Sequence, residues 1–214
     1  MDDVILCLFV CLVIPIIMSM LILKDKSRYL VLFMIFGMFM CLFAGQVNSL
    51  IQNLSGSDTY TMTTSVTPVV EEILKGIPIL TLYFVFKPGR QFMLESSVMV
   101  GIGFSLLENG FILLSNASSI TFLMALFRGL GSAMLHVATT VSVGFGISMF
   151  GVKKKTFMPG TYAVMLAAMV FHGVYNMFVQ SSKLMYFGII LPVLAFIPLV
   201  VYVVKTRKQI EGKA

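Results

Sequence analysis

The chain has 214 residues, of which 58% are hydrophobic and 11% are charged, and its formal net charge is +6. A soluble domain carries about 25% charged residues, so this composition excludes a soluble domain and indicates one integral membrane domain over residues 1–214. The positive charges lie in short clusters between apolar segments. Basic stripes with interleaved aromatic residues are absent, which excludes nucleic acid as a partner.

Long apolar segments divide the chain into predicted membrane spans. A spanning helix needs about 20 mostly apolar residues, and lipid leaves backbone groups without partners unless they pair within a helix or a closed barrel. The sequence therefore predicts an all-α, polytopic transmembrane helix bundle in the cell membrane with about seven spans. In chain order these are residues 4–23, 29–51, 67–86, 94–114, 127–150, 157–180 and 185–204.

The connections between these spans differ in charge. One set of alternate connections carries twelve basic residues, whereas the other set carries only Lys183, with Arg128 at the head of the fifth span as an interfacial residue. Basic residues favour the cytoplasmic side, so the N-terminus is predicted outside and the C-terminus in the cytoplasm. The longest external connection, 52–66, is rich in Ser, Thr and Asn and is predicted to be a solvated loop. The twelve residues are Lys24, Lys26, Arg28, Lys87, Arg90, Lys153, Lys154, Lys155, Lys205, Arg207, Lys208 and Lys213.

Four of the predicted spans contain residues that are costly to place in a membrane. An ionisable residue within a span is a functional candidate by default. Counted from the predicted outer ends at 1.5 Å per residue, these groups all lie roughly 8–14 Å below the external surface. Because four helices place them in one layer, we expect a single site. The residues are Glu71, Glu72 and Lys75, then Glu108, then His136, then His172 with Asn176.

Local spacing suggests how the third span begins and pairs its charges. Thr67-Pro68 is typical of a helix start, with Thr67 as the N-cap. The two glutamates then lie near the positive end of the helix dipole. Glu71 and Lys75 are four residues apart and are predicted to pair, while Glu72 points about 100° away.

These side chains suit peptide hydrolysis. The reaction needs a general base for water and donors or a metal for the oxyanion. A glutamate can be the base, and Glu108, His136 and His172 have the chemistry of a three-ligand zinc site. The HExxH motif is absent, so residues alone leave open whether a metal is bound.

Three motifs in order resemble the PrsW family of intramembrane proteases, which is related to the CAAX prenyl endopeptidases. They are Glu71-Glu72-x-x-Lys75, Phe104-x-x-x-Glu108 and His172-x-x-x-Asn176, with His136 between the last two. The CAAX-type pattern instead has EE-x-x-x-R and F-x-x-x-H. The resemblance covers about residues 66–180, the predicted catalytic core.

The resemblance implies a protease that cuts a membrane-anchored substrate near the extracytoplasmic face, such as an anti-sigma factor at its first cleavage site. It implies Glu71 or Glu72 as the base, Asn176 as an oxyanion donor, and Lys75 as a supporting counter-ion. Glu108, His136 and His172 would position water or a metal, with zinc as the implied ion.

Other functions remain open at this stage. Acids and histidines in one layer also fit an ion- or proton-coupled transporter, although transporter sites usually lie near the midplane between repeats and no repeat is evident. A CAAX prenyl endopeptidase-like protease and a non-catalytic membrane protein that retains the fold are the further alternatives.

Overall fold

In a computed structural model of the chain, the described residues are 12–14, 16–18, 20, 23, 25–118, 121–151, 154–181 and 183–211. All regular structure in these ranges is helical, which confirms the predicted all-α class. Most of the predicted first span, 4–23, lies outside the described residues. The elements are α2 (Asp25–Ser55), α3 (Thr59–Thr61), the π-helical segment η1 (Met62–Val66), α4 (Thr67–Phe86), α5 (Arg90–Ser115), α6 (Phe122–Phe150), α7 (Lys154–Gln180) and α8 (Met185–Glu211).

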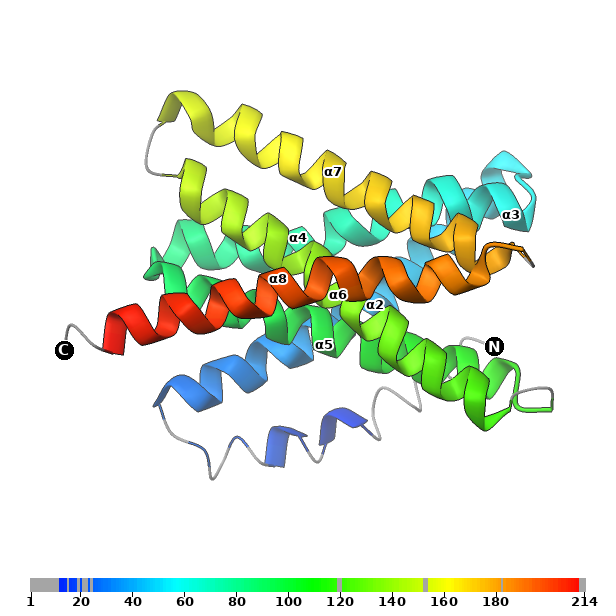
Figure 1. The fold of residues 1–214 in the computed structure, drawn as a ribbon, viewed down its shortest axis with the longest axis horizontal. Coiled ribbons are helices and arrows are strands. Elements are labelled where there is room, and N and C mark those ends of the chain that lie inside the picture. The colour runs from blue at the N-terminus through cyan, green and yellow to red at the C-terminus, as the bar shows by residue number, and fades with distance from the viewer. Residues whose placement is uncertain are drawn as a thin grey trace.

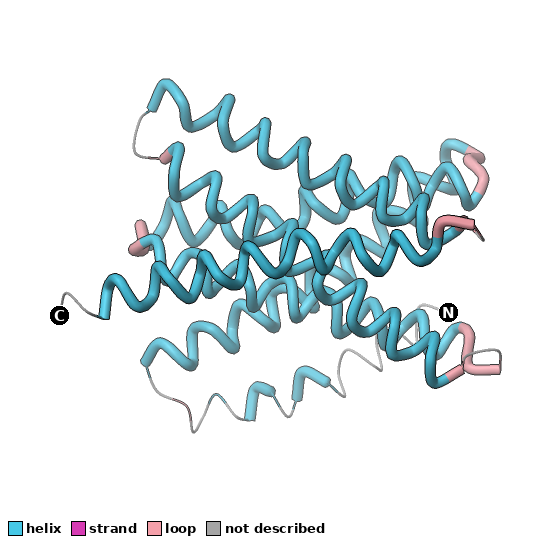
Figure 2. Tube along the Cα trace, in the orientation of Figure 1, coloured by secondary structure: helices cyan, strands magenta, loops and turns pink. Residues whose placement is uncertain are grey.

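The long helices form a bundle in which successive helices alternate in direction (Figure 1). The α4–α5 and α6–α7 connections lie at the same end of the bundle as the end of α8, and the other connections between the long helices lie at the opposite end, as Figure 2 also shows. Lys87 belongs to the first group of connections, and Arg90, Lys155 and Lys205 lie near the helix ends at that side. We call this the basic end of the bundle. Its placement in the cytoplasm stays a prediction.

Five helices are long and apolar enough to cross a membrane, which supports a multi-pass membrane protein. The helix α4 is not among them because three of its 20 residues, Glu71, Glu72 and Lys75, are charged. Its length of about 30 Å would still span the hydrocarbon core. The predicted count of seven spans is therefore not confirmed. The five are Asp25–Ser55, Arg90–Ser115, Ala125–Phe150, Lys155–Gln180 and Met185–Lys205.

The connection before α4 is mostly helical, which corrects two predictions. Of the predicted loop 52–66, only Gly56–Asp58 lies outside a helix, since α3 and η1 run without a break into α4. The N-cap is therefore Asp58, whose side chain accepts from the backbone N–H of Thr61, and not Thr67. The hydroxyl and the backbone N–H of Thr61 hold the pKa of the Asp58 carboxyl below its usual range. Glu71 and Glu72 lie more than two turns beyond this cap, where the expected dipole effect has faded.

Glycines bring three helices close enough to align the polar residues of the core. A Cβ at Gly101 of α5 would lie 2.8 Å from the carbonyl oxygen of His136 in α6, a distance that real Cβ atoms do not reach. Gly37 of α2 and Gly103 of α5 are in backbone contact with α5 and α2, respectively. Such close packing through small residues is typical of helices in membranes, and it fixes α5 between α2 and α6.

Candidate metal and catalytic centre

The polar centre begins with a buried ion pair on α4. Lys75 Nζ donates to Glu72 Oε1 over 2.6 Å, and the two side chains are 1% and 0% exposed. The sequence spacing predicted that Lys75 would pair with Glu71 instead. That prediction is wrong because Lys75 points toward α6, on the side of α4 where Glu72 also lies.

Lys75 also joins α4 to α6. Its ammonium lies 3.0 Å from His136 Nδ1 and donates to Thr139 Oγ1 over 3.2 Å. An ammonium has only donors, so His136 Nδ1 accepts this hydrogen bond. The other ring nitrogen, Nε2, then carries the proton and donates to Glu108 Oε2 over 2.9 Å. One histidine therefore links the polar groups of α4 and α5 through α6.

His172 is held from α4 in a similar way. Its Nδ1 lies 2.8 Å from Glu72 Oε1, and a carboxylate oxygen can only accept here. In the neutral ring the proton is therefore on Nδ1, and Nε2 presents its lone pair. A carboxylate on the far nitrogen is the usual support of a metal-binding histidine, because it fixes both the ring and the tautomer.

Glu71 faces the free nitrogen of His172. Its Oε2 lies 3.8 Å from His172 Nε2, and this buried oxygen has no hydrogen-bond partner among the described residues. When the His172 ring is neutral and Glu71 is ionised, two acceptors face each other without a donor, an arrangement that a cation would satisfy. Glu71, His136 and His172 can each offer one donor atom within 4.8 Å of the others. Three nitrogen and oxygen ligands are typical of a catalytic zinc site. This donor set fits such a metal if the Nε2 proton of His136 is displaced, because metal binding displaces protons from its ligands.

Glu108 receives contacts from three successive turns of α6. Arg128 NH2 lies 3.1 Å from Glu108 Oε1, while Ser132 Oγ and His136 Nε2 each lie 2.9 Å from Oε2. Arg128, Ser132 and His136 are spaced by four residues and so share one helix face. The Glu108 side chain is 20% exposed, in contrast to the enclosed Glu72. Its carboxylate is both oriented and accessible.

Phe104, the first residue of the F-x-x-x-E motif, supports these contacts. Its ring packs against that of His136 with centroids 5.0 Å apart, and Lys75 Nζ lies 5.2 Å from its centroid. The ring is fully buried. The aromatic residue of the motif therefore holds the histidine and the lysine in position.

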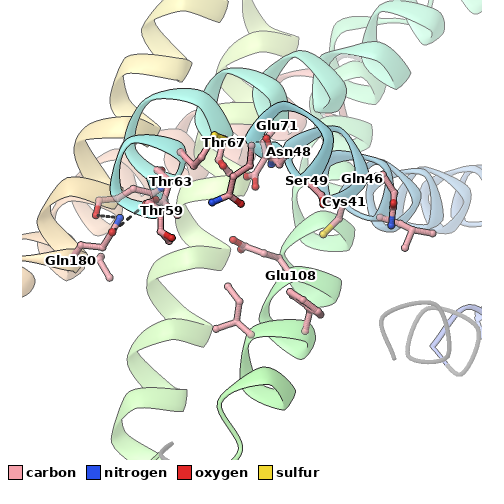
Figure 3. A pocket seen from close by; sticks show the side chains of 18 of the residues that line it. Cys41, Gln46, Asn48, Ser49, Thr59, Thr63, Thr67, Glu71, Glu108 and Gln180 are labelled. Atoms are coloured by element: carbon pink, nitrogen blue, oxygen red, sulfur yellow. Dashed lines mark hydrogen bonds between the residues drawn. The ribbon is translucent and has the colours of Figure 1, made fainter. Parts of the chain in front are cut away.

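A cavity of about 510 Å³ reaches this centre from the end of the bundle opposite the basic end. Glu71 and Glu108 both line it, together with Arg128 and Asn176. Glu72, His136 and His172 are not among its lining residues and lie behind it. Figure 3 shows Glu71 and Glu108 around the same open space, reached from α4 and α5.

Asn176 has a structural partner in η1. In a π-helix the N–H of residue i+5 donates to the carbonyl of residue i, as Thr67 does to Met62. By this pattern residue 68 would donate to Thr63, but Pro68 has no N–H. Asn176 Nδ2 donates to Thr63 O over 2.8 Å instead. Asn176 thus satisfies the carbonyl that Pro68 leaves without a backbone donor.

The structure brings all the predicted site residues to one place, with differences in detail. The predicted metal set was Glu108, His136 and His172, and it stays a prediction. The compact group of possible ligands is Glu71, His136 and His172, and Glu108 contacts His136 beside it. Arg128, predicted to be interfacial, instead points into the cavity and pairs with Glu108. The spacing of four between Arg128, Ser132 and His136 is the sequence signal that would have revealed it.

The fold and the site together define a multi-pass membrane protein. Its buried carboxylates and histidines lie beside a cavity that opens at one end of the bundle. The model of the PrsW family of intramembrane metalloproteases matches residues 25–203, and the chain belongs to this family. Comparison with curated proteins and with solved structures gave no match.

Proposed function

We propose that this membrane protease hydrolyses a peptide bond of a membrane-anchored protein near the outer face, as in the first cleavage of an anti-sigma factor. The observation that supports the site of reaction is the unpartnered Oε2 of Glu71, opposite His172 Nε2 at the base of a cavity. The placement at the outer face follows from the charge bias of the connections, because the cavity opens away from the basic end.

The metal would be held by Glu71, His136 and His172, and binding through His136 Nε2 would displace the proton that this nitrogen donates to Glu108. We propose zinc from this mixture of imidazole and carboxylate ligands. When bound, zinc supplies Lewis acidity, which polarises a carbonyl group and acidifies water. Glu72 and Lys75 hold the two imidazole rings from behind through His172 Nδ1 and His136 Nδ1.

Glu108 is the general base in this proposal, in place of Glu71 or Glu72, which the family resemblance implied. Its accessible carboxylate takes a proton from water as the water oxygen attacks the carbonyl carbon of the substrate. The proton then passes to the leaving nitrogen as the C–N bond breaks, which yields one carboxylic acid end and one amine end. Arg128 and Ser132 orient Glu108 for this transfer. The second N–H of Asn176, a residue that lines the cavity, is available for the developing oxyanion.

The assignment is tested with purified protein in detergent or nanodiscs and a single-span anti-sigma-factor-like substrate. Wild-type protein should cleave it, a chelator should stop cleavage, and added Zn²⁺ should restore it. Cleavage that is unchanged after complete metal removal would contradict the metal assignment. No cleavage by wild-type protein, together with ion-coupled flux in proteoliposomes, would support the transporter alternative instead.

A further inference from the structure

The α2 wall of the cavity carries no residue of the three motifs, yet its polarity is unusual for this helix. The helix α2 (Asp25–Ser55) is a candidate span, and its most apolar stretch of 18 residues has a mean hydropathy of 2.3. Its last third nevertheless turns a line of small and polar side chains toward the cavity. These are Gly45, Asn48, Ser49 and Gln52, which we call the α2 wall.

The other faces of α2 have clear partners. Phe33, Met38 and Ala44 are buried in the helix packing. Phe39, Phe43 and Leu50 are 46%, 51% and 58% exposed and are suited to contact lipid. The α2 wall is therefore a third face, and its polarity is explained neither by helix packing nor by lipid.

The α2 wall has open space and an unsatisfied hydrogen-bonding group. A Cβ at Gly45 would meet nothing within 4 Å. The buried Asn48 Oδ1 has no hydrogen-bond partner among the described residues. Glu71, whose buried Oε2 has no hydrogen-bond partner among the described residues and which is 6% exposed, also lines the cavity that this wall borders. Figure 3 shows Asn48 and Ser49 beside the space that Glu71 and Glu108 also border.

The chemistry of the reaction identifies the occupant. In a helical substrate each backbone carbonyl is hydrogen-bonded to the N–H four residues later, and side chains surround it. Hydrolysis requires an extended segment, and its freed N–H and C=O groups need new partners within the membrane. Amide and hydroxyl side chains can both donate and accept, so a wall of Asn, Ser and Gln provides those partners.

We propose that the α2 wall binds the backbone of an unwound peptide segment at the outer end of a substrate's transmembrane helix, and so presents it to Glu71 and Glu108. This inference rests on the proposed protease function. It assigns the substrate class as a single-span protein whose outer juxtamembrane segment unwinds readily. Gly45 and Ser49 leave room for the strand, and Asn48 and Gln52 pair with its backbone.

The test is a photocrosslinking experiment that does not depend on turnover. The full chain carries Glu108→Gln, and the diazirine amino acid photo-leucine, which is smaller than tryptophan, replaces either Ser49 on the α2 wall or Leu50 on the lipid side. The probe is a synthetic peptide with one apolar span of about 20 residues, lysines at one end and a Gly/Ser/Pro-rich segment at the other. A matched peptide has Ala and Leu in place of that segment.

We expect crosslinks to the Gly/Ser/Pro-rich peptide from position 49 and few from position 50, with weaker crosslinks to the helical peptide. Equal yields from both positions, no yield from position 49, or no preference between the peptides would overturn the inference. The outcome is separable from the proposed function, because a wild-type protein that fails to cleave the probe challenges that function, whereas crosslinking reports on the wall alone.

A kinetic experiment supplies a second criterion. Ser49→Trp should fill the space beside the α2 wall. It should raise KM for the Gly/Ser/Pro-rich peptide about tenfold or more while kcat stays within about twofold, since it weakens substrate binding and leaves the chemical step unchanged. Leu50→Trp, its neighbour on the lipid side, should change neither. Zn²⁺ affinity and the melting temperature of Ser49→Trp confirm an intact site. An unchanged KM in a folded Ser49→Trp protein would overturn the inference.

Discussion

The centre consists of two arms that use the same chemistry in different surroundings. The inner arm is Glu72, Lys75 and His172, and the outer arm is Glu108, Arg128, Ser132 and His136. In each arm a carboxylate oxygen holds a ring nitrogen, at 2.8 Å for His172 and 2.9 Å for His136. Glu72 is 0% exposed, whereas Glu108 is 20% exposed and lines the cavity.

This difference in exposure suits Glu72 to a structural role and Glu108 to a chemical one. A carboxylate sealed between an ammonium and an imidazole can hold geometry but cannot meet a substrate. A carboxylate that borders a cavity can exchange a proton with water. Adjacent glutamates in the sequence also divide in this way, since Glu71 lines the cavity and Glu72 does not. We therefore expect variants of the two arms to fail in different ways.

The largest effect should come from removing the carboxylates that border the cavity. Glu108→Gln should lower kcat by about 10²–10⁴-fold, the contribution of a general base, and leave Zn²⁺ affinity intact. Glu71→Gln should lose both activity and Zn²⁺ affinity. Cleavage assays and isothermal titration with Zn²⁺ measure the two properties.

The control for Glu108→Gln is Glu95→Gln, which lies on the same helix, α5. Glu95 pairs with Lys26 near the basic end and should not affect cleavage. If Glu108→Gln lost the metal and Glu71→Gln kept it, the roles of these two residues would be reversed.

Variants of the inner arm should mainly lower the free energy of unfolding. Lys75→Met leaves Glu72 as a buried charge without its cation, which costs about 3–5 kcal/mol of unfolding free energy. The double variant Glu72→Gln/Lys75→Met should recover much of that loss, though not activity, because His172 loses its carboxylate partner. Unfolding in mixed micelles measures these differences.

Lys26→Met is the matched control, since Lys26 also pairs with a glutamate but is 51% exposed. Its loss should change stability by about 0–1 kcal/mol. Equal destabilisation by Lys75→Met and Lys26→Met would contradict the distinction between a buried and an exposed ion pair.

A smaller effect is expected where α7 meets η1. Asn176→Ala should destabilise the fold by about 1 kcal/mol, because Thr63 O loses its donor in a partly buried position. Adding Pro68→Ala restores a backbone N–H at the position that the π-helical pattern directs to this carbonyl. The double variant should therefore be more stable than Asn176→Ala in the same unfolding assay. Additive destabilisation would show that Asn176 does not compensate for Pro68.

The smallest effect should come from changing Arg128 in the outer arm. Arg128→Lys keeps the positive charge near Glu108 but loses the planar guanidinium. Because Arg128 is 24% exposed, we expect kcat/KM to fall only about fivefold, equivalent to about 1 kcal/mol. Arg128→Leu should have the larger effect of the two. Steady-state cleavage kinetics compare the variants, and equal activity of Arg128→Leu and wild type would remove Arg128 from the site.

The sequence by itself determined the helical membrane class and the identity of the polar residues. Composition and long apolar segments suffice for the class, because lipid permits few backbone structures. Glu71, Glu72, Glu108, His136 and His172 were recognisable because ionisable groups in a span are costly. The ordered motifs gave the family, which the match over residues 25–203 confirms.

Only the tertiary structure decided which groups pair and which face the cavity. Helical spacing allows Lys75 to reach either Glu71 or Glu72, and the choice depends on His136 and Thr139, which another helix supplies. Asn176 meets Thr63 across 113 residues of sequence, and a proline inside a continuous helix creates its role. The α2 wall contains no motif residue at all. Periodicity within one helix cannot reveal these contacts, because each of them depends on how two helices are placed against each other.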